Sequence, residues 1–238
     1  MSSPYGVRLP YKLHIKLETT NDRVIIIGDI HGCYDEFMLL LQKCNYNSKK
    51  DTLILVGDLS MKGPKSLEVI RYVCQNNILS VRGNVDENSL FQYEKLKKSG
   101  TNNWGDYEWM KELTNTELKY LYELPYSISL PKYNILVVHA GMLPNKLVKE
   151  QELNDLIRLR CIQDDGIGTK DFLSKDKLWI NYWKGPEKIV FGHDAMRRLQ
   201  KTDFAIGLDT ACVYGYQLTA LVLPSNKIVQ VKSAKKYY

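Results

Sequence analysis

The segment RVIIIGDIHGCYDEFMLLLQKC (23–44) decides the architecture, because it runs directly from a strand pattern into a helix pattern. Residues 24–27 are a short run of β-branched side chains, which is typical of a buried strand. Further on, apolar side chains recur at i, i+3, i+4 and i+7, as on one face of a helix: Phe37, Leu40, Leu41 and Cys44. Asp29 and His31 lie between the two patterns. The segment therefore predicts a strand–loop–helix unit with polar side chains in its loop.

Four more apolar runs end in small polar clusters, and they predict strands at 53–56, 78–81, 135–138 and 189–191. A second helix is expected in PKSLEVIRYVCQN, where Pro64 suits a helix start. A third is expected after Thr114 and Glu117, which form a capping box. Strands alternating with helices in this way are typical of a layered α/β fold.

After residue 191 the pattern changes to closely spaced strands in DFAIGLD, YQLTALVLP and KIVQVK. Alternating units followed by a strand-rich end predict an α/β fold with two central mixed β-sheets flanked by helices. We expect a single domain over residues 1–238, with a motif-bearing core at about 23–232. The stretch SGTNNWGDYEW (99–109) is expected to be a loop covering the site.

The composition is that of an ordinary globular protein, with 44% apolar and 25% charged residues in 238. No apolar run approaches the roughly 18 residues of a membrane helix, and the first residues lack the apolar core of a secretory signal. Five cysteines without a CxxC pair favour reduced thiols and a cytoplasmic location. The net charge of +6 suits an anionic substrate such as a nucleotide or polyphosphate, but a solvated surface explains it equally well.

Polar side chains gather where the predicted strands end, which is where ligands bind in α/β sheets. They are Asp29, His31, Asp58, Asn84, His139 and His193. Each alone is explained by a turn, a helix cap or a structural hydrogen bond, which is our interpretation of the remaining histidine, His14. Together they favour Mn, Fe, Zn or Mg over a metal that prefers thiolates. Two such ions about 3.5–4 Å apart would clamp a phosphate for in-line attack.

Five ordered blocks resemble the phosphoprotein-phosphatase-type (PPP) metallophosphoesterases, which have the calcineurin-like fold. The blocks are GDIHG (28–32), GDLSMKG (57–63), RGNVD (82–86), HAG (139–141) and GHD (192–194). GDLSMKGP, FGHDAMRRLQ and GLDTACVYGYQLTALVLP are most similar to the ApaH-like, diadenosine tetraphosphatase-like branch. Calcineurin-like nucleases usually end in GHxH, whereas Ala195 stands at the second histidine here, which favours the phosphatase branch.

The resemblance implies a set of metal ligands. Asp29 and His31 would hold one ion, Asp58 would bridge both, and the second ion would be completed by Asn84, His139 and His193. A water with its pKa lowered by two cations would be the nucleophile, with no covalent phosphoenzyme. The implied cofactor is a pair of divalent ions, with Mn as the leading candidate and Fe, Zn, Co and Mg as alternatives.

Two positions depart together from the protein phosphatases, whose second and third blocks read GDxVDRG and RGNHE. Met61 replaces the aspartate that orients the histidine of GNHE, and Val85 replaces that histidine, which is thought to protonate the leaving alkoxide. General acid catalysis is worth about 10²–10⁴ in rate and matters least for good leaving groups. A phosphate, whose second pKa is about 6, leaves far more readily than a serine alkoxide. The paired loss therefore favours a phosphoanhydride substrate, unless another acid reaches in from a loop.

Several residues are candidates for substrate contact or catalysis. Arg82 would be a fork for phosphate oxygens, and Lys62 replaces the second-block arginine as a cation without bidentate geometry. Asp58, Arg82, Lys62 and Asp86 form our catalytic set, although Asp86 lacks the histidine that it would accompany. Arg160 could also reach a phosphate, and Tyr214 or Trp104 could stack on a base, but packing explains all three.

We therefore predict a two-metal hydrolase that cleaves a phosphoanhydride bond of a dinucleoside polyphosphate such as diadenosine tetraphosphate. The alternatives are a serine/threonine or tyrosine protein phosphatase, a polyphosphate or mRNA-cap pyrophosphohydrolase, and an inactive metal-binding scaffold. The expected partner is a nucleotide or polyphosphate, with no membrane and with nucleic acid only as capped RNA. The metal, the cleavage position, the base preference and the oligomeric state stay open at this stage.

Overall fold

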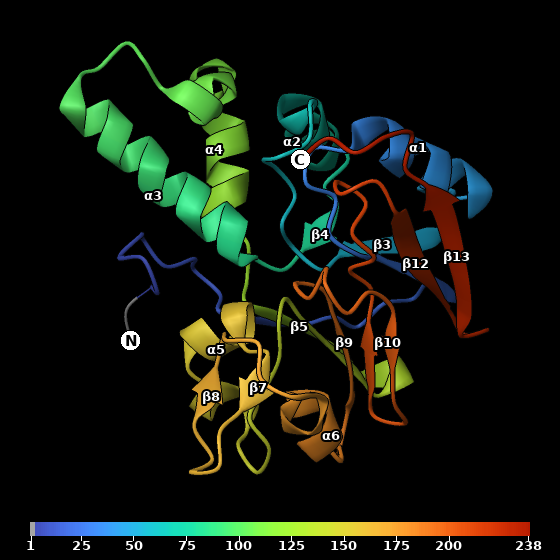
Figure 1. Ribbon diagram of the computed structural model, residues 1–238. Helices are drawn as coiled ribbons and strands as arrows, with labels where there is room; N and C mark the ends of the chain where they lie inside the picture. The colour runs from blue at the N-terminus through green and yellow to red at the C-terminus, as the bar shows by residue number, and fades with distance from the viewer. Residues whose placement is uncertain (1–2) are drawn as a thin grey trace.

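Two β-sheets stacked against each other form the centre of the computed structural model, which describes residues 3–238 (Figure 1). The first sheet has the strand order β1 (His14–Lys16), β5 (Ser127–Leu130), β6 (Ile135–Val138), β9 (Lys188–Phe191), β11 (Ala205–Gly207) and β10 (Gln200–Lys201). The second has the order β13 (Lys227–Lys232), β12 (Gln217–Leu223), β2 (Arg23–Ile27), β3 (Asp51–Leu55) and β4 (Leu79–Ser80). Each sheet contains parallel and antiparallel pairs, which confirms the expected α/β fold with two mixed sheets.

Strand β2 is apolar on both faces because both faces are covered. Val24 and Ile26 belong to the core between the sheets, together with Val137 and Val190 of the first sheet. Ile25 and Ile27 point the other way, because successive side chains alternate along a strand, and they pack beneath the helices. The continuous VIII run is therefore the pattern of a strand buried from two sides.

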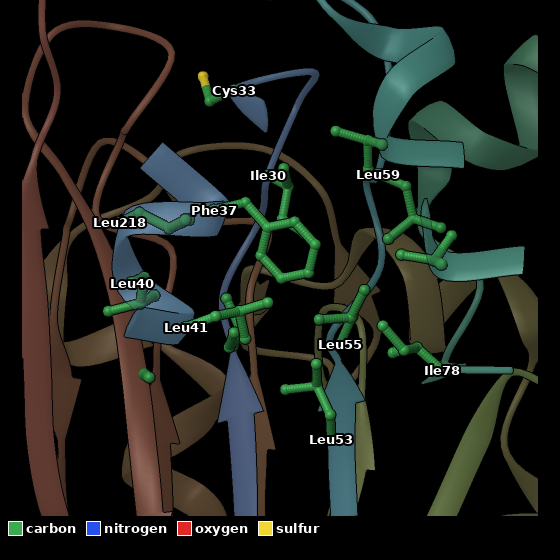
Figure 2. Packing of buried hydrophobic residues seen from close by; sticks show 14 of the residues in the cluster. Ile30, Cys33, Phe37, Leu40, Leu41, Leu53, Leu55, Leu59, Ile78 and Leu218 are labelled. Carbon is green, nitrogen blue, oxygen red and sulfur yellow. The ribbon is translucent and has the colours of Figure 1, made fainter. Parts of the chain in front are cut away.

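Helices cover the outer face of each sheet. On the second sheet they are α1 (Tyr34–Lys43) and α2 (Ser66–Gln75), while α4 (Asn115–Tyr122) packs against α2, and α3 (Asn84–Ser99) against α4, to one side (Figure 1). Figure 2 shows part of this core, with Phe37 of α1 beside Ile30. On the first sheet they are α5 (Leu153–Arg158) and α6 (Trp179–Tyr182), next to a small sheet of β7 (Cys161–Ile162) and β8 (Gly168–Thr169). Among residues 3–238, no helix has both the length and the apolar character needed to cross a bilayer.

The sequence predicted a loop at 99–109, and this prediction is wrong for residues 105–109. Helix α3 ends at Ser99, where Gly100 has φ 68°, and a 3₁₀ helix, η1, spans Gly105–Glu112. The remaining 3₁₀ helices are η2 (Pro131–Tyr133), η3 (Val148–Glu150) and η4 (Lys175–Lys177). The sequence pattern gave no sign of α3, because this helix buries three polar side chains and a single apolar one, Leu90. Apolar periodicity is the main helix signal, and here it is nearly absent.

The capping box before α4 is confirmed. The Thr114 hydroxyl accepts a hydrogen bond from the Glu117 backbone N–H at 3.3 Å, and the Glu117 carboxylate accepts one from the Thr114 N–H at 2.7 Å. We expect Thr114→Ala to lower the free energy of unfolding by about 1 kcal/mol. Thermal unfolding should then shift down by about 2–4 °C. Thr116→Ala, an exposed position inside the same helix, is the matched control and should be neutral or slightly stabilising, because alanine has the higher helix propensity.

Candidate metal centre

The six candidate ligands converge where the strand ends of the two sheets meet. Asp29 and Asp58 follow β2 and β3 of the second sheet, and Asn84 is the first residue of α3. His139 and His193 follow β6 and β9 of the first sheet. The structure thus brings together polar groups from positions that lie as far apart as 29 and 193 in the chain.

The contacts among these side chains are short. Ligand atoms of Asp29, His31 and Asp58 all lie within 4.8 Å of one another. His139 Nε2 lies 3.0 Å from Asn84 Oδ1 and 3.4 Å from Asp58 Oδ1, so Asp58 contacts both groups of residues. The rings of His139 and His193 are 5.1 Å apart between centroids.

The backbone around these residues is held in an uncommon conformation. His31, Asp58 and His193 have φ angles of 46°, 49° and 66°, in the left-handed region that costs a non-glycine residue free energy. Gly192 is required for packing, because a Cβ there would lie 1.9 Å from Asp29 Oδ1. Strained positions of this kind cluster at functional sites, so the loop geometry supports a role beyond folding.

Each histidine presents a ring nitrogen to the centre. His31 Nδ1 lies 3.2 Å from the Ser60 carbonyl oxygen and His139 Nδ1 lies 2.7 Å from that of Val56. A ring nitrogen beside a carbonyl must donate, so Nε2 of both rings carries the lone pair that faces inward. His193 Nε2 is buried and has no hydrogen-bond partner among the described residues.

Burial favours the uncharged forms of these groups in the protein alone. It raises the pKa of Asp58 to about 6 and raises the pKa of Asp29 well above the usual range. It lowers the pKa of His139 to about 4, and the pKa values of His31 and His193 also fall well below the usual range. Oxygen and nitrogen lone pairs therefore face one another among largely buried side chains. Cations satisfy such a set, and these donors suit divalent metals such as Mn, Fe, Zn or Mg.

One acidic residue of the centre was missed by the sequence prediction. Asp209 is buried, its carboxyl interacts with that of Asp29, and Oδ1 accepts a hydrogen bond from the Ala211 N–H at 3.0 Å. It stands two residues beyond the end of β11, as Asp29 stands two residues beyond the end of β2. A consistent search for acids just after predicted strands would have found it.

Comparison with known proteins now identifies the fold family. Residues 22–223 match the family model of calcineurin-like phosphoesterases. The chain belongs to this family. The phosphoesterase fold, with metal ligands on loops after its strands, accounts for the position of the cluster, and the family implies divalent metal ions there.

Two relatives of the phosphoesterase are similar over most of their length, and a third over less than half of its length. The chain is 32% identical over 238 residues to the asymmetrical bis(5'-nucleosyl)-tetraphosphatase PrpE of Bacillus velezensis, covering 89% of this chain and 93% of the relative. A crystal structure assigned to a diadenosine tetraphosphatase matches with a TM-score of 0.83 and 37% identity, covering 94% of this chain and 99% of the other. A symmetrical bis(5'-nucleosyl)-tetraphosphatase of Actinobacillus pleuropneumoniae is 40% identical over 121 residues, half of this chain and 45% of that protein.

Two cationic side chains of the phosphoesterase lie beside the candidate ligands. Lys62 Nζ is 3.2 Å from His31 Nε2. Burial lowers the pKa of Lys62, but Asp58 and Tyr214 outweigh it, so the net pKa of the ammonium is raised and the group is charged. Arg160 Nη2 lies 3.4 Å from the His193 carbonyl oxygen and Nη1 lies 3.0 Å from that of Lys170.

The expectation that Arg82 contacts phosphate is wrong in this structure. Its side chain is fully buried, and Nη1 donates to Glu87 Oε2 at 2.9 Å. Nη2 donates to the backbone carbonyls of Tyr122 at 2.5 Å and Leu121 at 3.4 Å. The guanidinium therefore joins α3 to the end of α4 and has no free face for a substrate.

Asp86 also has a different role from the expected catalytic one. Its carboxylate accepts hydrogen bonds from the backbone N–H groups of Asp58, Leu59 and Gly83, at 2.8, 3.0 and 2.9 Å. Burial raises its pKa to about 6. Asp86 is thus a positioning residue that fixes the loop carrying Asp58.

The aromatic candidates separate into one near the centre and one away from it. The Tyr214 ring centroid lies 5.5 Å from Lys62 Nζ, so this tyrosine borders the cationic side of the site. Trp104 is 7% exposed and packs edge-on against Tyr93 at 5.6 Å, which agrees with the packing role preferred for it over stacking on a base. Its place near the site is taken by Trp109 of η1, whose Nε1 contacts Met61 Sδ at 3.4 Å.

Proposed function

We propose that this phosphoesterase hydrolyses a phosphoanhydride bond of a dinucleoside polyphosphate such as diadenosine tetraphosphate, using two divalent ions. The observation that carries the proposal is the replacement of a leaving-group acid and its partner by Val85 and Met61, both of which line one cavity beside Lys62. The similarity to bis(5'-nucleosyl)-tetraphosphatases supports the same substrate class.

The ligand arrangement supports two ion positions that share Asp58. Asp29 and His31 would hold the first ion with Asp58, and the second would use Asn84, His139 and His193. When bound, two such ions would polarise phosphate oxygens and lower the pKa of water. Mn is our leading candidate, because oxygen donors and imidazoles suit it, and Fe, Zn, Co and Mg are the alternatives.

The protein's own groups would orient the substrate and hold its charge. Lys62 and Arg160 are cations beside the candidate ligands, and in this proposal they would contact phosphate oxygens around the reacting phosphorus. Asp86 and the Ser60 and Val56 carbonyls keep Asp58, His31 and His139 in place through the contacts described above. In this proposal, neither of the two replaced positions, Met61 and Val85, has a residue that can deliver a proton to the leaving group. A phosphate leaving group tolerates that, because its second pKa is about 6, whereas an alkoxide does not.

The contribution of Lys62 is testable by substitution. We expect Lys62→Met to lower kcat/KM for diadenosine tetraphosphate by about 10- to 150-fold, which corresponds to one hydrogen bond to a charged group. Lys62→Arg should retain part of the activity, because the charge persists while the geometry changes. Steady-state kinetics of the manganese-loaded variants provide the measurement. Equal kcat/KM for wild type and Lys62→Met would remove this residue from the proposed phosphate contacts.

The proposed reaction is tested with a panel of substrates at one metal concentration. It should contain diadenosine tetraphosphate, inorganic polyphosphate, capped RNA, a phosphotyrosine peptide and a phosphoserine peptide. We expect kcat/KM for the dinucleotide to exceed that for the phosphoserine peptide by at least about 100-fold, the lower end of what general acid catalysis supplies. Chromatography of the nucleotide products identifies the bond that is cleaved. Preferred turnover of phosphoserine would overturn the proposal and favour a protein phosphatase.

A further inference from the structure

The cavity lined by Met61, Lys62 and Val85 has a volume of about 720 Å³ and opens beside the candidate metal centre, and the proposed chemistry assigns no ligand to most of it. Lys62 and Val85 belong to its lining and connect it to the centre, because Lys62 Nζ contacts His31 and the Val85 N–H donates to Asp58 Oδ1 at 2.9 Å. The rest of its lining includes residues at the start of α2, residues of η1, and Tyr238. Figure 1 shows the C-terminus beside α2, in agreement with this position. The volume is within the roughly 300–1,000 Å³ of small-molecule sites.

Apolar and aromatic side chains form part of the lining of this cavity. Met61 and Val85 are the two residues that replace the acid and its partner, and here they line the same cavity as Trp109, Tyr107 and Tyr238. Two contacts fix the rings of η1. Trp109 Nε1 lies 3.4 Å from Met61 Sδ, and the Tyr107 hydroxyl accepts a hydrogen bond from Asn88 Nδ2 at 2.8 Å. Both rings are half-buried, so each leaves surface free for a flat ligand.

Charges are separated across the cavity. Its cationic side chain, Lys62, lies next to the metal centre, whereas four acids belong to the remaining wall: Glu68, Asp106, Glu108 and Glu112. Carboxylates repel phosphate and accept hydrogen bonds from exocyclic amino groups of bases. A nucleotide would therefore enter with its phosphates at Lys62 and its base among the aromatic rings.

We propose that this cavity, the aromatic pocket, binds one nucleobase of the dinucleoside polyphosphate, with Trp109 as the main stacking surface. The inference rests on the proposed function, because it assigns one end of that substrate. It also gives the paired replacement at Met61 and Val85 a second consequence. Met61 and Val85 cannot deliver a proton, but their apolar side chains offer a surface on which a base can lie.

The experiment compares two substrates that share the anhydride bond and differ in the base. Diadenosine tetraphosphate and inorganic tripolyphosphate are assayed with manganese-loaded wild type, Trp109→Ala, Trp109→Phe and Tyr107→Ala. Stacking of one base on an aromatic side chain predicts that Trp109→Ala lowers kcat/KM for the dinucleotide by about 10- to 100-fold, mainly through KM. The preference for the dinucleotide over tripolyphosphate should fall at least tenfold, and Trp109→Phe should restore most of it. Tyr11→Ala removes an aromatic ring that lies outside the pocket and is 90% exposed, and it should leave kcat/KM unchanged for both substrates.

The outcomes separate the pocket from the function. If Trp109→Ala and Tyr107→Ala, checked for folding by thermal unfolding, leave the substrate preference unchanged, the aromatic pocket does not bind the base. If wild type cleaves tripolyphosphate but not the dinucleotide, the proposed function fails instead. In that case calorimetric titration of the metal-loaded protein with AMP and with inorganic phosphate still decides the inference. Tighter binding of AMP that weakens at least tenfold in Trp109→Ala supports the pocket, and equal binding overturns it.

Discussion

Replacement of Asp58 by asparagine is expected to abolish turnover of diadenosine tetraphosphate while the fold persists. Asp58 is the residue whose two carboxylate oxygens face different histidines, with Oδ1 3.4 Å from His139 Nε2 and Oδ2 3.5 Å from His31 Nε2. An amide has one oxygen and no negative charge, so it cannot hold two cations. Loss of outer-shell partners alone costs about 10- to 100-fold, so kcat/KM should fall by at least about 100-fold.

The fold should tolerate this substitution because asparagine has the same shape. Its Oδ1 can still accept the hydrogen bond that Asp58 Oδ1 takes from the Val85 N–H at 2.9 Å. Burial already disfavours the charged carboxylate and raises its pKa to about 6. Loss of the charge therefore removes an unfavourable buried charge from the metal-free protein. Thermal unfolding without metal should therefore match or exceed that of wild type. Added Mn²⁺ should raise the unfolding temperature of wild type and leave that of Asp58→Asn almost unchanged.

Asp22→Asn is the control for this experiment, because the Asp22 side chain is fully exposed and pairs only with Lys132 at the surface. Its turnover and its response to Mn²⁺ should equal those of wild type. Full turnover in Asp58→Asn would remove the bridging role and with it the two-metal assignment. Loss of folding in that variant without metal would mean that the carboxylate supports the structure instead.

The strand ends were predictable because each depends only on nearby residues. A β-branched run followed at once by Asp or His places that side chain at the sheet edge whatever the rest of the chain does. Asp29, Asp58, His139 and His193 all follow this pattern, and all lie together in the structure. Asp209 obeys it as well and was missed only because its strand belongs to the closely spaced C-terminal group.

Properties that depend on distant packing could not be predicted in the same way. The RGNVD motif shows that an arginine stands at position 82, but it does not show where the guanidinium points. That direction depends on Glu87 and on carbonyls at the end of α4. Likewise, the sequence does not distinguish Trp104 from Trp109 as the ring near the site. The backbone of η1 decides which of the two borders the cavity. The position of Val85 in the lining of the cavity follows from the same packing.

Replacement of Arg82 by methionine should destabilise the protein strongly and affect chemistry little. The Arg82–Glu87 pair is fully buried, with Nη1 2.9 Å from Oε2. Removal of the cation leaves a buried carboxylate with the Tyr126 hydroxyl, 2.8 Å from Oε2, and the Ser3 hydroxyl as its remaining side-chain partners. Breaking a buried pair by removing one partner costs about 3–5 kcal/mol. The free energy of unfolding, measured in urea, should fall by that amount, and the unfolding temperature by about 6–20 °C.

The double variant Arg82→Met with Glu87→Leu distinguishes pairing from any contact with substrate. Removing both charges leaves no uncompensated ion, so much of the lost stability should return. At a temperature where all variants are folded, kcat/KM of Arg82→Met should stay within a few-fold of wild type, in contrast to the loss expected for Lys62→Met. A double variant that is stable but has lost more than about tenfold in kcat/KM would place Arg82 among the phosphate contacts after all. The resemblance to the protein phosphatases would then predict this residue better than its packing does.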